Sequence, residues 1–213
     1  MTSSRPRPLR IVLIVLFVVA LLVLAGVLAV LIPILTHQSA GGSGQELPQD
    51  YVSSVEAKGA DGRTRELSAK TADGADAELE NIAPGESLVV TGSGFDSGIG
   101  IYLAICAIPA TPDEKPGPCL GGIPEGAETG EANAETGLSS AWITSDWAWR
   151  AFATQSYDDN ASGSFTATLT VPPPTVDGLD CRVSRCAITT RADHTAAKDR
   201  VQDMMLPVAF RTE

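Results

Sequence analysis

Six titratable side chains lie close together near the C-terminus, Asp193, His194, Lys198, Asp199, Arg200 and Asp203, and all but Lys198 are the first candidates for a binding site. Three carboxylates supply the oxygen ligands that a hard cation such as calcium prefers. The mixed charges also suit a recognition loop between two strands. The alternative is a polar connection in which Asp and Arg pair with each other, each exposed pair contributing about 0 to 1 kcal/mol. The sequence shows no EF-hand-like spacing, and we predict no metal site.

His194 is the one histidine beyond residue 37 and is the candidate for acid–base chemistry. Asp193 precedes it, but neighbours in the chain seldom orient one another as a Ser-His-Asp triad requires, and the sequence holds no G-x-S-x-G motif. The sequence shows no nucleophile–base pair, metal cluster or cofactor motif elsewhere. We therefore predict a protein that is not an enzyme and has no cofactor. A pH-sensing role for the imidazole is an alternative that the sequence leaves open.

Three tryptophans, Trp142, Trp147 and Trp149, fall within eight residues of a chain that is only 5% aromatic. Clustered tryptophans favour a binding patch for a ring, a sugar or a partner protein. The alternative is that Trp142 packs in the core while the other two cover an edge of a sheet. With Ala148 between them, Trp147 and Trp149 would share one face of a strand.

The chain contains four cysteines, Cys106, Cys119, Cys181 and Cys186. An even count in an oxidising compartment indicates two disulfides, and three pairings are open. Pairing of sequence neighbours is the simplest; the first pair would then close a loop of about 13 residues and contribute about 3 kcal/mol. A zinc site would need Cys-x2-Cys or His spacings, which are absent here, so we expect no zinc.

The elements that must position these residues begin with an apolar run. Residues 11–35 hold no charged side chain. At about 1.5 Å per residue, a helix of this length is long enough to cross the roughly 30 Å hydrocarbon core of a bilayer. Three arginines precede the run, and no further basic residue follows until Lys58. This asymmetry predicts a single-pass protein of the cell membrane with a cytoplasmic N-terminus and an extracytoplasmic C-terminal domain.

A cleaved signal peptide is the competing interpretation of this run. Its apolar stretch is usually about 7 to 15 residues, which is shorter than the run here. Ala40 would be the cleavage residue, but Gln38 departs from the small-x-small pattern of cleavage sites. We therefore expect an uncleaved anchor.

The chain divides into five parts: 1–10, a cytoplasmic basic N-terminus; 11–35, the transmembrane helix; 36–50, a flexible linker; 51–83, an edge strand or partly disordered segment; and 84–213, a β-sandwich domain. Beyond residue 35 lie all 26 acidic residues and 12 of the 15 basic residues, a net charge of −14. Such an acidic surface argues against nucleic acid and against anionic lipid headgroups as partners. We expect the bilayer to hold residues 11–35 and a membrane or cell-surface protein to bind the domain.

From residue 84 the sequence alternates strands with turns. Apolar residues recur at period two in 99–105 and in 163–171, which is typical of half-buried strands. Further strands are expected at 87–91, 139–144, 182–190 and 204–210. Outside the apolar run the sequence shows no helical period, so we predict an all-β fold: an immunoglobulin-like antiparallel β-sandwich with two local disulfides, preceded by one transmembrane helix.

The ordered set of these strands resembles the neocarzinostatin-like family of immunoglobulin-like sandwiches from high-GC Gram-positive bacteria. The matching stretches are SLVVTGSGF (87–95), IYLAICAI (101–108), GSFTATLTV (163–171), Asp180-Cys181 with Cys186, and LPVAF (206–210). The resemblance covers about residues 84–211 and implies the same fold with two local disulfides. It also implies carriage of a small molecule in an open aromatic cleft.

Three positions depart from that family's ligand-lining pattern. Ile108 stands where the family has an aromatic residue, Ala187 where it has a polar one, and Arg191 where it has a small one. The resemblance therefore does not carry chromophore binding to this chain. The chain also resembles uncharacterised surface and heme-acquisition-associated domains through KPGPC (115–119), SSAW (139–142) and the RADHT segment with its DR and QD pairs. That likeness implies fold and location more than activity.

These observations predict a membrane-anchored extracytoplasmic binding or adaptor domain without catalysis, and an accessory subunit of a membrane protein complex is one form of it. The alternative is a carrier of a hydrophobic small molecule or a surface ligand-binding protein, as the family resemblance implies. The candidate binding residues are Trp142, Trp147, Trp149, Asp193, His194, Asp199, Arg200 and Asp203.

Overall fold

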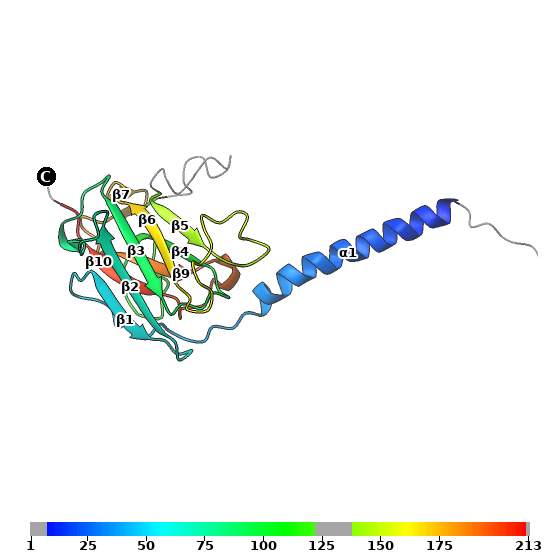
Figure 1. The fold of residues 1–213 in the computed structure, drawn as a ribbon, viewed down its shortest axis with the longest axis horizontal. Coiled ribbons are helices and arrows are strands. Elements are labelled where there is room, and N and C mark those ends of the chain that lie inside the picture. The colour runs from blue at the N-terminus through cyan, green and yellow to red at the C-terminus, as the bar shows by residue number, and fades with distance from the viewer. Residues whose placement is uncertain (1–7, 122–137, 212–213) are drawn as a thin grey trace, which may run out of the picture. The chain divides into compact units, whose positions relative to one another are not determined.

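A computed structural model describes residues 8–121 and 138–211 of the chain (Figure 1). The chain divides into two compact units, 1–37 and 38–213, and each is described by itself. Of the predicted basic N-terminal part, Arg5 and Arg7 lie outside the described residues.

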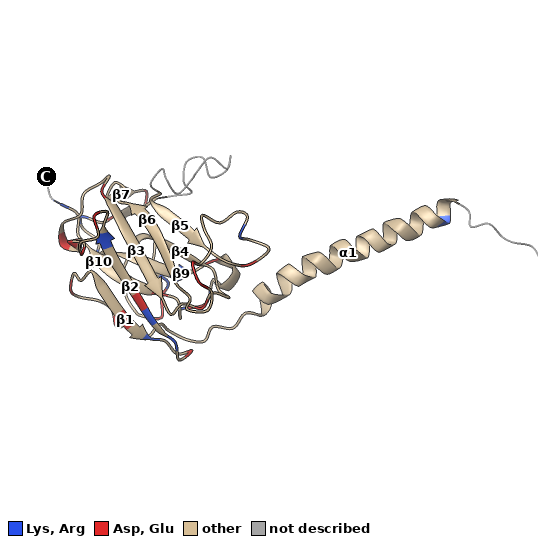
Figure 2. Cartoon of the chain, in the orientation of Figure 1, with Lys and Arg blue, Asp and Glu red and all other residues tan. Residues whose placement is uncertain are grey.

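The first unit contains one helix, α1 (Pro8–Thr36). Its 29 residues rise about 43 Å, enough to cross a bilayer. Figure 2 shows no charged residue in this helix beyond Arg10. The Thr36 hydroxyl donates to the Ile32 carbonyl (2.7 Å), which satisfies a carbonyl of the last turn. The predicted apolar helix is thus present; its length and composition suit a membrane span, and a signal sequence near an N-terminus has the same features.

The second unit holds two four-stranded antiparallel sheets. The first sheet has the order β1-β2-β3-β6, with β1 (Ser54–Lys58), β2 (Thr64–Thr71), β3 (Ser87–Ser93) and β6 (Phe165–Thr170). The second sheet has the order β10-β9-β4-β5, with β4 (Ile101–Ala107), β5 (Ser140–Ile143), β9 (Cys186–Ala192) and β10 (Met204–Val208). Smaller elements are the hairpin of β7 (Thr175–Val176) and β8 (Leu179–Asp180) and the 3-10 turns η1 (Leu79–Asn81) and η3 (His194–Ala196).

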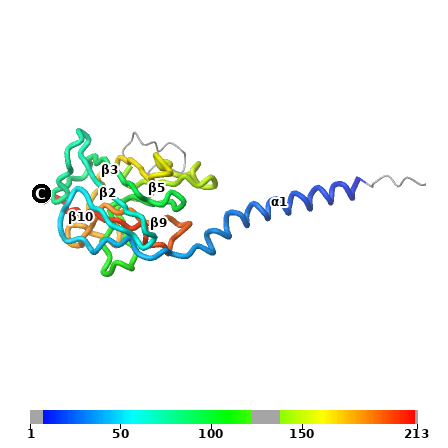
Figure 3. Tube along the Cα trace, turned by 60° about the horizontal axis from the view of Figure 1, so that its bottom comes forward, coloured from blue at the N-terminus to red at the C-terminus, as the bar shows by residue number. Residues whose placement is uncertain are grey.

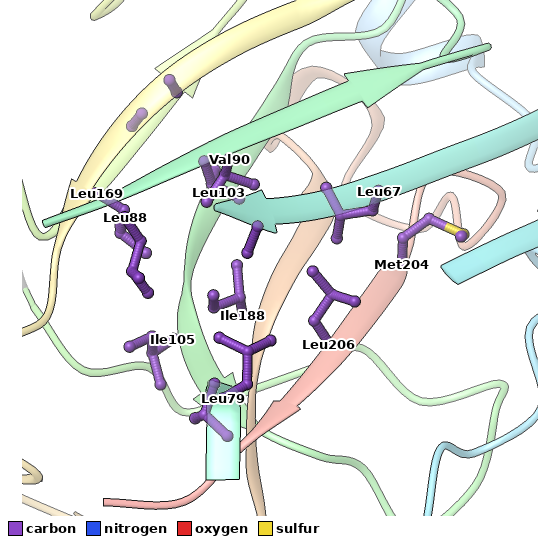
Figure 4. Packing of buried hydrophobic residues seen from close by; sticks show 14 of the residues in the cluster. Leu67, Leu79, Leu88, Val90, Leu103, Ile105, Leu169, Ile188, Met204 and Leu206 are labelled. Carbon is purple, nitrogen blue, oxygen red and sulfur yellow. The ribbon is translucent and has the colours of Figure 1, made fainter. Parts of the chain in front are cut away.

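One apolar core fills the space between the two sheets. Figure 4 shows Leu67, Val90 and Leu169 from the first sheet facing Leu103, Ile188 and Leu206 from the second. Each of these side chains is fully buried because it occupies the inward-pointing positions of a strand with period two. The predicted all-β antiparallel sandwich is confirmed.

Two predicted segments hold more structure than their sequences indicate. Within 51–83 the chain forms the hairpin of β1 and β2, in which β1 is the edge strand of the first sheet, one of the two alternatives expected for this segment, and β2 lies inside the sheet. Within 36–50, Gly42 pairs with Arg200, and the Gln45 side chain exchanges two hydrogen bonds with the Met205 backbone (2.7 Å each). The linker is therefore not flexible throughout, because the Gln45 side chain bonds the backbone groups at the edge of β10 that a neighbouring strand would otherwise bond.

Both local disulfides are present. Cys106 is bonded to Cys119 across 13 residues, and Cys181 is bonded to Cys186 across 5. The first disulfide holds the chain after β4 beside the end of that strand, where Ala107 accepts from Gly117 and donates to Pro118 through the backbone.

The strand directions bring several loops to one end of the sandwich. The strands β1, β3, β5 and β9 finish at this end, and their partners β2, β4, β6 and β10 begin there. The loops 59–63, 94–100, 144–164 and 193–203 therefore gather together. Residues 42–45 also reach this end, because Gly42 pairs with Arg200 (Figure 3, light blue beside red). We call it the tether end.

Candidate functional site

A row of three large side chains crosses the outer face of the second sheet. Tyr102 on β4 pairs in register with Trp142 on β5 on one side and with Arg191 on β9 on the other. Paired residues in an antiparallel sheet project from the same face, so the three side chains stand next to one another. The Tyr102 and Trp142 ring centroids lie 5.9 Å apart, and the Arg191 guanidinium lies 5.9 Å from the Tyr102 centroid.

Asp193 fixes the turn that follows β9. Its carboxylate is buried and accepts hydrogen bonds from the Thr195 amide (2.8 Å) and the Thr195 hydroxyl (2.6 Å), which caps η3. Its other oxygen accepts from the Trp142 indole Nε1 (2.9 Å). Gly100 leaves the room for this carboxylate, since a Cβ there would lie 2.0 Å from Asp193 Oδ2. The Asp193 carboxylate therefore links η3 to β5, and both of its oxygens are already hydrogen-bonded within the protein.

His194 stands at the centre of a set of rings, here called the ring cluster: Tyr102, Trp142, Trp149 and His194. The imidazole packs edge to face against Trp149 (4.8 Å between centroids) and Trp142 (5.1 Å). The Trp142 and Trp149 centroids lie 6.3 Å apart. The Tyr102 hydroxyl and His194 Nδ1 are joined by a hydrogen bond of 2.9 Å. Burial, followed by the charge of Asp193, raises the pKa of Tyr102. His194 is exposed and the three other rings are half-buried, so the cluster is reachable from solvent.

A tight turn after β5 brings Trp149 to this cluster. The Asp146 carbonyl accepts from the Arg150 amide (2.8 Å), and its carboxylate accepts from the Ala148 amide (2.8 Å). Trp147 and Trp149 therefore lie in a turn, and the prediction that they share a strand face is wrong. The turn separates them: Trp149 packs on His194, whereas Trp147 is 69% exposed.

Two half-buried cations border the ring cluster. Lys115 Nζ donates to the Ala192 carbonyl (3.0 Å), and Arg191 donates to the Pro116 carbonyl (3.0 Å). These bonds join the KPGPC and RAD motifs, which lie about 75 residues apart in the sequence. Burial lowers the pKa of both groups, and for Lys115 the neighbouring charge of Arg191 lowers it further. The charge of Asp203 acts in the opposite direction on both groups but does not offset their burial, so both side chains hold their charge at a cost that a further anion would reduce.

The three other candidate residues of the predicted recognition loop, Asp199, Arg200 and Asp203, are buried. Arg200 donates to the Asp203 carboxylate (2.8 Å) and to the Ala197 carbonyl (2.6 Å). Asp199 accepts from the Val201 amide (2.7 Å). Burial raises the pKa of Asp203 to about 7, in spite of the charges of Arg200 and Lys115. These three side chains stabilise the loop, as the alternative of a self-paired polar connection expects.

The three carboxylates considered as ligands of a hard cation, Asp193, Asp199 and Asp203, are not arranged as a metal site. Among residues 8–121 and 138–211 the structure contains no group of three or more His, Cys, Asp or Glu side chains arranged to hold a metal ion. The Asp193 carboxylate is turned to Trp142 and Thr195, and the Asp203 carboxylate is turned to Arg200.

Sequence reasoning missed Tyr102 and Lys115 as site residues. Tyr102 alternates along its strand with the buried residues Ile101, Leu103 and Ile105. The alternation of the sequence therefore could have shown that the Tyr102 side chain points out of the core. Lys115 lies in the KPGPC motif, but its position beside β9 depends on the disulfide loop folding back over the sheet.

Comparisons with known proteins give one distant likeness. No family model matches the chain, and no curated protein matches its sequence. Among solved structures, the chain is similar to macromomycin, with 15% identity over 68% of this chain and 98% of that chain and a TM-score of 0.36. This is a likeness of fold at a distance, and it transfers no ligand and no residue role to this chain.

Proposed function

We propose that this chain is a single-pass membrane protein whose extracytoplasmic sandwich binds a partner protein without catalysis, as an adaptor or accessory subunit of a membrane complex. The observation that carries the proposal is the ring cluster. Four rings from β4, β5, the turn after β5 and η3 converge on a solvent-reachable part of the second sheet.

The helix and the disulfides support the location. Residues 8–36 form an apolar helix of sufficient length, and three arginines fall within the first ten residues, which favours a cytoplasmic N-terminus. Both cysteine pairs are oxidised in the domain, as is usual outside the cytosol. The anchor would hold the domain at a high effective concentration beside other membrane proteins.

The composition of the site supports binding rather than chemistry. Tryptophan, tyrosine and arginine are the residues that most often dominate protein interfaces. Among the described residues, His194 forms no hydrogen bond with a serine or cysteine that would make a nucleophile pair; its partner is the Tyr102 hydroxyl. Because Arg191 and Lys115 are charged and half-buried, a partner that presents an acidic side chain beside an apolar one would complement them.

Co-purification from membranes in mild detergent tests this proposal. The Trp149→Ala substitution removes a ring that packs on His194 and is expected to lose the partner that the wild-type chain retains, with a loss of affinity of about 2 kcal/mol, or roughly thirtyfold. Trp147→Ala is the matched control, since it changes the same residue type in the same turn but leaves the cluster intact. Equal capture by the Trp149 variant and the wild type would contradict the proposal.

A carrier of a small aromatic molecule is the second candidate, because edge-to-face rings around His194 also suit a planar ligand. The two functions separate in the purified chain. A carrier would show saturable quenching of tryptophan fluorescence by a hydrophobic ring compound, competing with a partner protein at the same site. An adaptor would bind its partner and show no such saturation.

A further inference from the structure

Two large apolar side chains at the tether end are not used by the ring cluster. Trp147 is 69% exposed and Phe152 is 76% exposed, in the same turn after β5. The Phe152 amide donates to the Trp149 carbonyl (2.8 Å), so the turn that carries both side chains is hydrogen-bonded within itself. Exposed aromatic side chains of this size are costly in water and favour the interface between lipid headgroups and acyl chains.

The chain enters the domain at the same end. Helix α1 finishes at Thr36, and Gly42 is already paired with Arg200. Six extended residues span at most about 21 Å. If α1 spans the bilayer, the tether end therefore stays within reach of the membrane surface, where a weak affinity suffices because the effective concentration is high.

The charges identify the kind of surface. The turn 144–153 contains one acidic residue, Asp146, and one basic residue, Arg150, so it is neutral. Exposed carboxylates of Asp158 and Asp159 follow on the same loop. These groups offer no attraction to anionic headgroups, so contact with lipid would depend on the aromatic side chains and not on charge.

We propose that Trp147 and Phe152 insert into the interfacial region of the lipid bilayer, so that the tether end of the sandwich rests on the membrane. The inference depends on the anchor in the proposed function and adds a second contact with lipid. It also gives Trp147 and Trp149 different tasks: Trp147 meets lipid while Trp149 remains in the ring cluster, accessible to a partner.

Depth-dependent fluorescence quenching of the full chain in vesicles of zwitterionic phosphatidylcholine tests the insertion. The chain has three tryptophans, so W142F/W149F leaves Trp147 as the sole reporter. We expect its emission to shift to the blue and to lose intensity when the lipids carry bromine in the upper acyl chain. We expect the F152S substitution in the same background to reduce the quenching of Trp147 by brominated lipid. We expect vesicles that contain anionic lipid to quench Trp147 no more strongly than zwitterionic vesicles do.

A reporter at the opposite end provides the matched control. Val183 is 84% exposed beside the start of β9, far along the strand from the tether end. In a W142F/W147F/W149F background, V183W is expected to be quenched by aqueous iodide and not by brominated lipid. Two results would overturn the inference. In the first, Trp147 is quenched by iodide and not by brominated lipid, as the V183W reporter is expected to be. In the second, the Trp147 emission is shifted to the blue but brominated lipid does not quench it, which indicates burial against protein.

Two further measurements keep the result decisive. If W142F disturbs folding through loss of the bond to Asp193, the wild type is compared with W147F, and the inference then requires the brominated-lipid quenching to fall in W147F. An alkaline carbonate wash separates the two proposals. A chain that washes off the vesicles would overturn the anchor and this inference together, whereas a retained chain with unquenched Trp147 would overturn this inference alone.

Discussion

The two sheets of the sandwich differ in what covers their outer faces. The first sheet alternates regularly, and its outward positions, such as Glu66, Ser68 and Thr168, remain accessible to solvent. A shallow hollow of about 200 Å³ lies over this face and is lined mainly by hydroxyl and carboxylate side chains. On the second sheet, the outward positions Thr189 and Met205 are buried as completely as inward ones.

The covering of the second sheet comes from segments without regular structure. The disulfide loop from Cys106 to Cys119 folds back over this face, where Lys115 donates to the Ala192 carbonyl and Arg191 donates to the Pro116 carbonyl. Gln45 closes the free edge of β10 at Met205. Under this cover the Thr189 hydroxyl donates to the Ala104 carbonyl (3.3 Å). The polar groups of the ring cluster and its bordering cations occur at the margin of the covered sheet, where burial is partial. The aromatic and cationic side chains therefore gather where the sheet is covered in part, whereas the open face of the first sheet carries mainly hydroxyl and carboxylate side chains.

The largest expected difference comes from placing one charge on each outer face. We expect Thr189→Lys to lose about 4 kcal/mol or more in free energy of unfolding, because the ammonium would be buried without a partner. Thr168→Lys, at an outward and exposed position of β6, should change that free energy by no more than about 0.5 kcal/mol. Denaturant unfolding of the full chain in micelles measures both. Similar losses in the two variants would show that the second sheet is not covered.

The two disulfides give the next largest difference. Replacing Cys106 and Cys119 by Ser is expected to cost about 3 kcal/mol, and replacing Cys181 and Cys186 about 2 kcal/mol, because the longer loop loses more closure entropy. The first change should also speed amide hydrogen exchange along β9, since it frees the cover of that sheet. Unfolding and hydrogen exchange measure these effects. Unchanged exchange in β9 would show that the loop keeps its place over the sheet without the disulfide.

The last expected effect is a dependence on pH. Burial raises the folded-state pKa of Asp203 from 3.8 to about 7, so the folded protein holds this proton more tightly than the unfolded chain. Stability from this group is therefore full below pH 3.8 and falls as pH rises to about 7, with a slope of up to about 1.4 kcal/mol per pH unit. Asp203→Asn should flatten this slope in thermal unfolding between pH 5 and 7.

Asp180 supplies the control of opposite sign. Hydrogen bonds from Arg182 lower the pKa of this exposed carboxylate to about 2, so its contribution is present above pH 3.8 and is lost only as pH falls toward 2. Asp180→Asn should leave the profile between pH 5 and 7 unchanged. A slope that survives in the Asp203 variant would point to another buried group.

Much of the sandwich was predictable from local pattern. The period-two apolar residues Ile101, Leu103 and Ile105 predicted β4, and the residues around Phe165 predicted β6, because an inward face of a strand needs apolar side chains at every second position. The site was only partly predictable. Trp142 and His194 stood out by type, but their meeting depends on the register of β4 with β5 and on the turn capped by Asp193.

Residues close together in the chain were enough to predict the apolar helix, the six strands from β3 to β6 and β9 to β10, and the presence of two oxidisable cysteine pairs. The strand expected at 182–190 forms at Cys186–Ala192, because the residues before Cys186 make a turn. Only the tertiary structure places Trp149 against His194 while Trp147 is exposed. It alone brings Lys115 close enough to Arg191 for their charges to interact. It also decided that Asp203 lies in the interior. A polar side chain is buried when segments distant in the sequence pack over it. The local alternation of apolar and polar residues carries no information about such packing.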